Sequence, residues 1–164
     1  MFKVGQNVYS QTSGVCVISS IEEKNFGVGE IKYFVLESIF KKQTSKTYIP
    51  VDKADVQLRT LITKNEAKNL LKYIAKAEKV WENDPKQRRQ MFEDMYKSKD
   101  LKSRYQLIKS LHLQNEELKK QKKSLSMLDK DFFDKIQRDI VEELSLGLED
   151  SLEEARKTFE KALN

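Results

Sequence analysis

The sequence has little of what most catalytic and metal sites need. Its 164 residues include one cysteine, one histidine, two prolines and five glycines. Because Cys16 stands alone, the chain cannot form an intramolecular disulfide or a thiolate metal cluster. His112 lies in an apolar helical pattern, where a partly buried structural role is the usual one. No Ser-His-Asp set, zinc-ligand spacing, P-loop or GxGxxG motif is found. We therefore predict a protein that is not an enzyme and that binds no cofactor or metal.

Long apolar runs are also missing. No run approaches the ~18 apolar residues of a membrane-spanning helix. The sequence after Met1 is strand-like at once, with no apolar signal segment. We expect a cytoplasmic protein without membrane contact. Charged residues make up 35% of the chain, and together with the scarcity of proline this indicates a globular, helix-rich protein.

The charge is unevenly distributed along the chain. Residues 1–60 carry 8 Lys/Arg and 6 Asp/Glu, residues 61–138 carry 20 and 12, and residues 139–164 carry 3 and 8. A positive excess in the middle of the chain attracts polyanions. The same excess also fits an ordinary solvated helical surface, so the charge alone leaves nucleic-acid contact open.

The sequence pattern changes near residue 60, which predicts two domains, 1–60 and 61–164. The first has the short apolar runs of β-strands, at 8–9, 15–21, 33–39, 47–49 and 56–58. Five such strands predict a small, bent antiparallel barrel and an α+β fold, with a polar turn over 41–46 and bends at Gly5 and Gly14. Pro50 either marks an edge strand open to strand addition or simply ends a strand.

After residue 60 the apolar residues recur at helical spacing and predict a bundle of about five helices. The first apolar stripe runs from Ala67 to Trp81, behind a capping box at Thr63 and Glu66. Further helix starts are predicted at Asp84, after 98–100, at Ser126 and at Ser151, with Gly147 ending the fourth helix.

Trp81 has two interpretations. It extends the first helical stripe, which indicates a core or inter-helix anchor. It also precedes a helix break and the basic run 86–89, where an aromatic ring can stack on bases or wedge between them.

Several segments resemble the CarD/CdnL family of bacterial transcription regulators. In the front half these are Met1-Phe2-Lys3-Val4-Gly5-Gln6-Asn7-Val8-Tyr9, Ser13-Gly14-Val15-Cys16-Val17-Ile18, Ile21-Glu22-Glu23-Lys24, Lys32-Tyr33-Phe34-Val35-Leu36 and Tyr48-Ile49-Pro50-Val51-Asp52-Lys53-Ala54-Asp55. In the rear half they are Ser98-Lys99-Asp100-Leu101, Leu107-Ile108-Lys109-Ser110-Leu111, Leu125-Ser126 and Glu142-Glu143-Leu144-Ser145-Leu146. The resemblance extends from residue 1 to about residue 148. The transcription-repair coupling factor carries a module similar to the front half alone.

The resemblance implies a Tudor-like domain that binds the RNA polymerase β subunit by strand pairing. It also implies a helical domain that contacts promoter DNA upstream of the −10 element, with a tryptophan wedged into the minor groove. By position, the polymerase-binding residues are Lys24, Phe26, Tyr48, Ile49 and Pro50. The DNA-binding residues are Trp81, Lys86, Arg88, Arg89, Lys109 and Lys130.

Two departures from the family pattern concern the front domain. The usual Pro-x-His-Gly is here Gln11-Thr12-Ser13-Gly14, and Tyr48 stands where an arginine is common. The loss of that arginine would remove one salt bridge to the polymerase.

The resemblance thus implies a monomeric, nucleoid-associated regulator that binds RNA polymerase and stabilises the promoter open complex. Two other classes stay open. One is a stand-alone nucleoid-type DNA-binding protein. The other is a protein–protein adaptor whose basic face makes no DNA contact.

Overall fold

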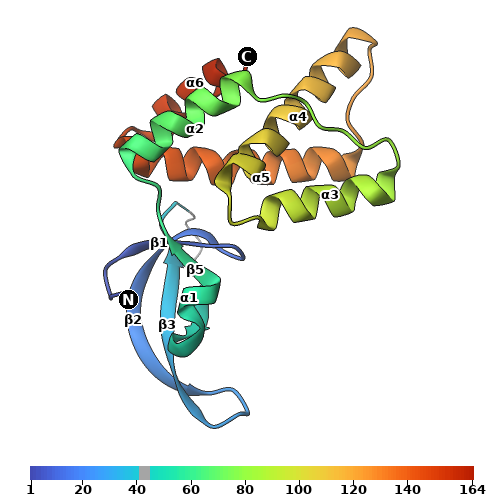
Figure 1. Cartoon of the computed structure of the whole chain (residues 1–164). Helices are drawn as coiled ribbons and strands as arrows, with labels where there is room; N and C mark the ends of the chain where they lie inside the picture. The colour runs from blue at the N-terminus through green and yellow to red at the C-terminus, as the bar shows by residue number, and fades with distance from the viewer. Residues whose placement is uncertain (41–44) are drawn as a thin grey trace. The chain divides into compact units, whose positions relative to one another are not determined.

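The computed structural model describes residues 1–40 and 45–164 and divides into two compact units, Met1–Leu61 and Ile62–Asn164 (Figure 1). The expected polar turn over 41–46 falls for the most part on residues 41–44, which lie outside the described residues.

The N-terminal unit is a five-stranded antiparallel sheet, which confirms the α+β class and the expected number of strands. Along the sheet the strand order is β4-β3-β2-β1-β5, so β4 and β5 are the two edge strands. The strands are β1 Asn7–Ser10, β2 Gly14–Asn25, β3 Glu30–Ser38, β4 Lys46–Pro50 and β5 Leu58–Thr60.

One face of this sheet carries a small apolar core, consisting of Val8, Cys16, Ile18, Phe34, Leu36, Ile49, Ala54 and Leu58. The sheet bends where the β2–β3 register shifts between Ile18 and Ser20. The extra residue, Ser19, donates its Oγ hydroxyl to the Val35 carbonyl at 3.2 Å. Such a bulge increases the local twist and lets the long strand β2 curve around the core.

The strand predicted over 56–58 is wrong for most of its length. Residues Val51–Lys53 form the 3-10 turn η1, Ala54–Gln57 form the single helical turn α1, and β5 begins only at Leu58. A helical turn brings Ala54 and Leu58 onto one side, and both are buried in the sheet core while Val56 is 89% exposed. On an extended strand Val56 would share the buried face of Ala54 and Leu58, so its exposure is explained by the helical turn.

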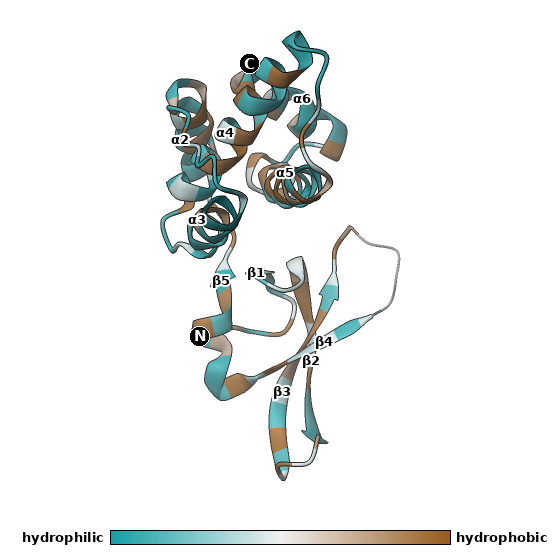
Figure 2. Ribbon diagram, turned by 90° about the vertical axis from the view of Figure 1, so that its right-hand side faces the viewer, coloured by the Kyte–Doolittle hydropathy of each residue, from teal (hydrophilic) through white to brown (hydrophobic). Residues whose placement is uncertain are grey.

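The C-terminal unit contains five helices in the described residues, as expected. They are α2 Lys64–Lys76, α3 Pro85–Lys97, α4 Leu101–Lys120, α5 Met127–Leu148 and α6 Leu152–Leu163. Colouring by hydropathy shows hydrophobic and hydrophilic residues alternating along β3 and along the helices, as expected of elements with one buried side (Figure 2).

The predicted helix starts are confirmed. Thr63 and Ser151 each form a complete capping box, with Glu66 and Glu154 respectively. Asp84 accepts a hydrogen bond from the Gln87 amide at 2.9 Å, and Ser126 accepts one from the Asp129 amide at 3.2 Å. These side chains satisfy amides that the first helical turn leaves unpaired.

Two predicted helix ends are wrong. Helix α2 stops at Lys76, where Ala77 turns extended, so the helix does not reach Trp81. Helix α5 continues through Gly147 to Leu148 and ends at Glu149, whose φ is 59°. Gly147 is needed for a close approach instead, since a Cβ there would lie 3.2 Å from both Cγ1 and the carbonyl oxygen of Ile62.

None of the helices in the described part of the chain combines the length and apolar character needed to cross a membrane.

Candidate functional site

The first candidate surface is the edge strand β4. Among the residues that the structure describes, β4 pairs with β3 alone: Tyr48 lies opposite Val35, Ile49 opposite Phe34 and Pro50 opposite Tyr33. Side chains alternate along a strand, so Ile49 points into the core and Tyr48 and Pro50 point to the other face. Ile49 is only 4% exposed, so only its backbone is available to a partner. Pro50 has no N–H and closes the strand at that end.

Three aromatic rings gather on the face of the sheet opposite the core, and we call them the outer aromatic cluster: Phe26, Tyr33 and Tyr48. Ring centroids of Phe26 lie 5.2 Å from Tyr33 and 5.5 Å from Tyr48, in edge-to-face geometry. Tyr33 and Tyr48 are themselves 6.3 Å apart. Phe26 remains 60% exposed, so the cluster offers an apolar surface beside the edge strand.

The hairpin loop explains how Phe26 reaches the cluster. Asn25 Oδ1 accepts hydrogen bonds from the amides of Gly27 at 2.9 Å and Gly29 at 3.3 Å. Both glycines have positive φ, at 101° and 93°, a conformation that other residues adopt only with strain. Beside the loop, Lys24 forms an ion pair with Glu22 at 3.5 Å. The Lys24 side chain remains exposed in this pair, so a partner can reach it.

The second candidate surface surrounds residues 77–84, which we call the Trp81 loop. Side chains of α4 hold this segment: Ser110 Oγ accepts from the Val80 amide at 2.9 Å, and Gln106 donates to the Glu78 carbonyl at 3.2 Å. Lys79 forms an ion pair with Glu117 at 3.0 Å. These contacts replace the hydrogen bonds that a longer α2 would have made.

Trp81 is half-buried, and its ring contacts both the helical core and two cations. Its ring packs edge-to-face on the buried Phe92, with centroids 5.7 Å apart. The guanidinium of Arg88 lies over the ring at 4.9 Å and the ammonium of Lys79 at 5.8 Å. Trp81 is therefore anchored to the helical core on one side and surrounded by cations on another.

Arg88 holds the Trp81 loop to the helices. It donates to the carbonyls of Glu82 at 3.0 Å and Asn83 at 3.1 Å, and it pairs with Asp129 at 3.2 Å. Its side chain is only 13% exposed. This geometry makes Arg88 a positioning residue for Trp81.

The remaining predicted cations differ in accessibility. Lys86, Arg89 and Lys130 are exposed, the first two on α3 and the third on the first turns of α5. Where the starts of α3 and α5 meet, a pocket of about 200 Å³ is lined by Pro85, Arg88, Arg89, Phe92, Ser126, Leu128, Asp129 and Phe132. Arg89 thus lies next to the residue that holds Trp81.

Lys109 does not lie on a basic surface as expected. It is 7% exposed, and its Nζ donates to the Leu163 carbonyl at 2.8 Å. The lysine satisfies a carbonyl that the last turn of α6 leaves unpaired, and a cation at a helix C-terminus is favoured by the helix dipole. Its ammonium is therefore occupied inside the helical unit.

His112 is half-buried on α4, consistent with a structural role. Burial lowers the pKa of His112 below its ordinary value of 6.5, and nearby Lys109 lowers it further, against Glu116 and a hydrogen bond with Asn164. Across residues 1–40 and 45–164, no three His, Cys, Asp or Glu side chains are grouped to hold a metal ion.

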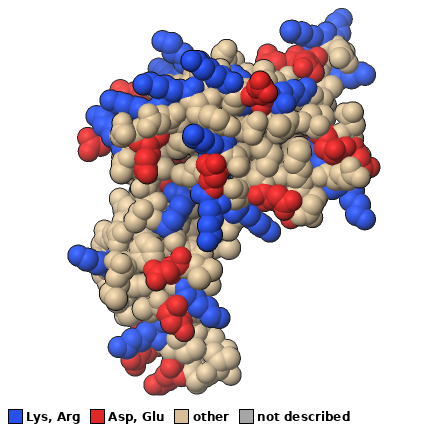
Figure 3. All heavy atoms as spheres, viewed as in Figure 1, with Lys and Arg blue, Asp and Glu red and all other residues tan. Residues whose placement is uncertain are grey.

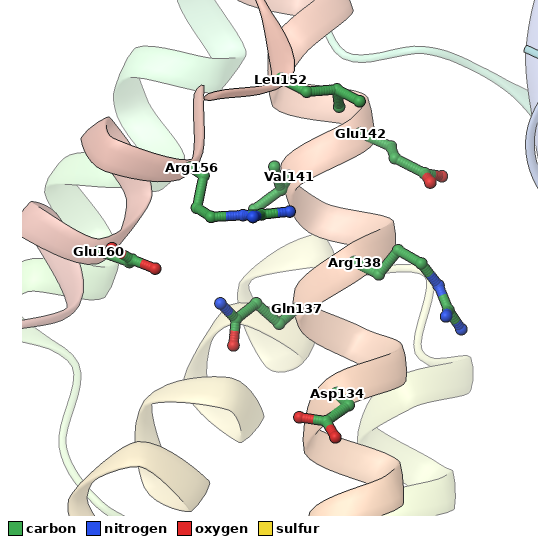
Figure 4. Close-up of a pocket in the computed structure, with 8 residues that line it drawn as sticks. All are labelled: Asp134, Gln137, Arg138, Val141, Glu142, Leu152, Arg156 and Glu160. Atoms are coloured by element: carbon green, nitrogen blue, oxygen red, sulfur yellow. The ribbon is translucent and has the colours of Figure 1, made fainter. Parts of the chain in front are cut away.

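A larger pocket of about 420 Å³ lies between α5 and α6 (Figure 4). Its lining carries both signs of charge, Arg138 and Arg156 together with Asp134, Glu142 and Glu160. In Figure 4 Arg156 points from α6 toward α5, whereas Arg138 and Glu142 point away from α6. Two arginines against three acids leave one excess negative charge, so the lining does not mark the pocket as a site for an anion.

The N-terminal unit, which contains β4, is similar to a known domain family. Residues 2–62 match the model of the CarD-like/TRCF RID domain. This match confirms the resemblance to CarD/CdnL proteins for the N-terminal unit. The RID domain is a protein-interaction domain with a transcription-related role at RNA polymerase. No curated protein matches the chain.

Two residues of these surfaces were missing from the sequence prediction. Tyr33 completes the outer aromatic cluster, and alternation along β3 could have placed it opposite the core-facing Phe34. Lys79 borders Trp81 through contacts with α4, which no local pattern indicates.

Proposed function

We propose that the chain is a transcription regulator that binds the RNA polymerase β subunit and stabilises the promoter open complex. In this proposal the RID domain docks on the polymerase, and the helical unit contacts DNA upstream of the −10 element. The observation that carries the proposal is the match of residues 2–62 to the RID domain, together with the free edge of β4 in that domain.

On the polymerase side, the proposed contact is strand addition along β4. A partner strand would bond the unpaired backbone groups of the edge, which provides affinity without requiring particular side chains. Specificity would come from the outer aromatic cluster and from Lys24 beside it. At Tyr48 the cluster presents an aromatic ring where an arginine is common and would form a salt bridge. The partner residue that contacts this ring should therefore be apolar or cationic.

On the DNA side, Trp81 would act at the edge of the melted region and the exposed cations would hold phosphates. Lys86, Arg89 and Lys130 are accessible for such contacts, whereas Arg88 acts by holding the Trp81 loop. Phosphate contacts fix position without reading sequence, so the DNA affinity should be salt-sensitive and only weakly sequence-specific.

The proposed mechanism needs contacts that form only after the promoter melts. A ligand shifts an equilibrium only by its differential affinity for the two states. A difference of ~1.4 kcal/mol in favour of the melted promoter would increase the open-to-closed ratio about tenfold. Docking on the polymerase supplies a high local concentration, so the affinity for isolated DNA can remain low.

The polymerase contact is tested with two matched charge substitutions on the two edge strands of the full-length chain. Tyr48→Glu alters the β4 edge, and Thr60→Glu places the same charge at an exposed position of the β5 edge. We expect Tyr48→Glu to abolish capture of a β-subunit fragment and Thr60→Glu to retain it. Equal capture by both variants would contradict docking through β4.

The DNA contact is tested by the half-life of open complexes with Trp81→Ala and Trp81→Phe. Phenylalanine keeps most of the packing on Phe92, so it controls for loss of the fold. We expect Trp81→Ala to shorten the half-life while the helical unit remains folded, at a somewhat lower melting temperature because the contact with Phe92 is lost. If Trp81→Ala unfolds the helical unit and Trp81→Phe has full activity, Trp81 is a core anchor only.

The same assays separate the two other functional classes. A stand-alone DNA-binding protein would bind duplex DNA at physiological salt without polymerase. A pure adaptor would bind the polymerase but show no salt-dependent effect of DNA on the complex.

A further inference from the structure

Helix α2 carries a regular row of four lysines that no proposed role has used. Lys64, Lys68, Lys72 and Lys76 follow one another at intervals of four residues and are all exposed. The helix buries Ala67, Leu70 and Ile74 on its other side. Residues four apart form a ridge on a helix surface, so the four ammonium groups line one edge of the unit. We call this row the α2 lysine ridge.

Most neighbours of the ridge within α2 are uncharged. Asn65, Glu66, Asn69 and Ala75 are the other exposed residues of the helix. The only acid of the helix, Glu66, is used in the capping box, where it accepts from the Thr63 amide at 2.7 Å. Figure 3 shows blue side chains along the upper left of the view, where α2 lies, with a smaller number of red side chains beside them.

Some lysines on the other helices are neutralised by acids. Lys97 pairs with Glu93 on α3, Lys119 with Glu116 on α4 and Lys157 with Glu153 on α6. None of the ridge lysines makes an ion pair within the described part of the chain. The ridge is therefore a block of unneutralised charge.

This arrangement works against the stability of α2. Like charges four residues apart on a helix repel each other, and the ridge contains three such pairs. Lys64 also lies in the first turn, where the positive end of the helix dipole disfavours a cation. A solubilising surface needs neither feature, since lysines paired with glutamates would serve it equally well.

We propose that the α2 lysine ridge binds the phosphate backbone of duplex promoter DNA, as a second contact beyond the Trp81 loop. This inference rests on the proposed function and extends the DNA path along α2. The ridge ends at Lys76, directly before the Trp81 loop begins at residue 77. From Lys64 to Lys76 the helix rises about 18 Å. Measured along the duplex axis, this length corresponds to about five phosphates of one DNA strand.

The ridge is tested in the full-length chain by changing all four lysines to glutamine. The matched control changes Lys97, Lys99, Lys119 and Lys157 to glutamine, so both variants lose the same charge from exposed positions of the helical unit. Binding of a labelled duplex is measured by fluorescence anisotropy across a salt series. The ridge variant should reduce the slope of log K against log salt by about 3–4, because each phosphate contact contributes about 0.9. The control should change it by less than about 1.

The outcomes separate the ridge from the proposed function. If the ridge variant matches the control while wild-type protein prolongs open complexes, the ridge inference fails and the proposed function stands. If the ridge variant loses DNA affinity while wild-type protein leaves the open-complex half-life unchanged, the ridge stands and the proposed function fails.

A cross-linking experiment locates the contact directly. Asn69→Cys introduces a thiol beside the ridge, and the native Cys16 is fully buried and does not compete. A photo-reactive group at position 69 should label promoter DNA in the polymerase complex. A group attached through Lys32→Cys in the N-terminal unit serves as the control. Equal labelling from the two positions would overturn the ridge contact.

Discussion

The two units of the molecule expose their aromatic side chains in different ways. In the N-terminal unit, Phe26 and Tyr48 lie on the face of the sheet opposite the core, and the fold depends on Ile49 instead. In the helical unit, Trp81 packs on the buried Phe92 and is held by Arg88. In the sheet, the residues proposed for binding are therefore different from the adjacent residues that stabilise the fold. Around Trp81, the same side chains have both roles in the proposal.

The largest effect should separate the two faces of β4. Ile49→Ala removes a buried side chain and should destabilise the N-terminal unit by about 2–5 kcal/mol. Tyr48→Ala removes only half-buried ring contacts on the other face and should cost about 1 kcal/mol. Denaturant unfolding of the two variants measures both values. Similar losses at the two positions would show that the outer aromatic cluster belongs to the core.

A smaller effect distinguishes two of the three predicted DNA-binding lysines of the helical unit, Lys109 and Lys130. Lys109→Met leaves the Leu163 carbonyl without its donor and should cost about 1–3 kcal/mol of stability. Lys130→Gln changes an exposed side chain and should leave the free energy of unfolding within about 0.5 kcal/mol. Thermal unfolding gives the first comparison. Of the two substitutions, only Lys130→Gln should weaken DNA binding while leaving the fold unchanged.

The α2 lysine ridge should show an effect of the opposite sign. Replacing its lysines by glutamine removes three repulsive pairs, each worth about 0.2–0.5 kcal/mol. The variant should therefore be more stable than wild type by roughly 0.6–1.5 kcal/mol, although it binds DNA less well. Urea unfolding at low salt tests this, and the gain should shrink as salt screens the charges. A loss of stability would show that the lysines contribute packing instead.

The smallest effect concerns pH and applies to the helical unit alone. The pKa of His112 is lowered in the folded protein by burial, so the unfolded chain binds its proton more readily. The resulting stability is fully present above pH 6.5 and is lost as the pH falls toward the lowered pKa. His112→Gln should flatten this decline in thermal unfolding between neutral and acidic pH. An unchanged pH profile would assign the decline to other groups.

Local signals in the sequence determined much of the fold. Thr63, Asp84, Ser126 and Ser151 begin helices as predicted, because a capping side chain and the amide it accepts from lie within three residues of each other. Four of the five strands were found from their short apolar runs, and the fifth begins only at the last residue of the predicted run 56–58. Phe26 and Tyr48 could likewise be assigned to a surface beside the edge strand from the resemblance and the hairpin pattern.

Other features were decided only by tertiary contacts. Trp81 left the predicted helix because side chains from α4, some 30 residues later, bind the backbone of its loop. Lys109 turned inward because the end of α6, which it caps, is 54 residues away in the sequence. Val56 left its predicted strand because an extended chain would turn it to the same face as Ala54 and Leu58, whereas on a helical turn only those two face the sheet core. Periodicity and capping describe neighbours along the chain, and they carry no information about a partner that folding brings from a distant segment.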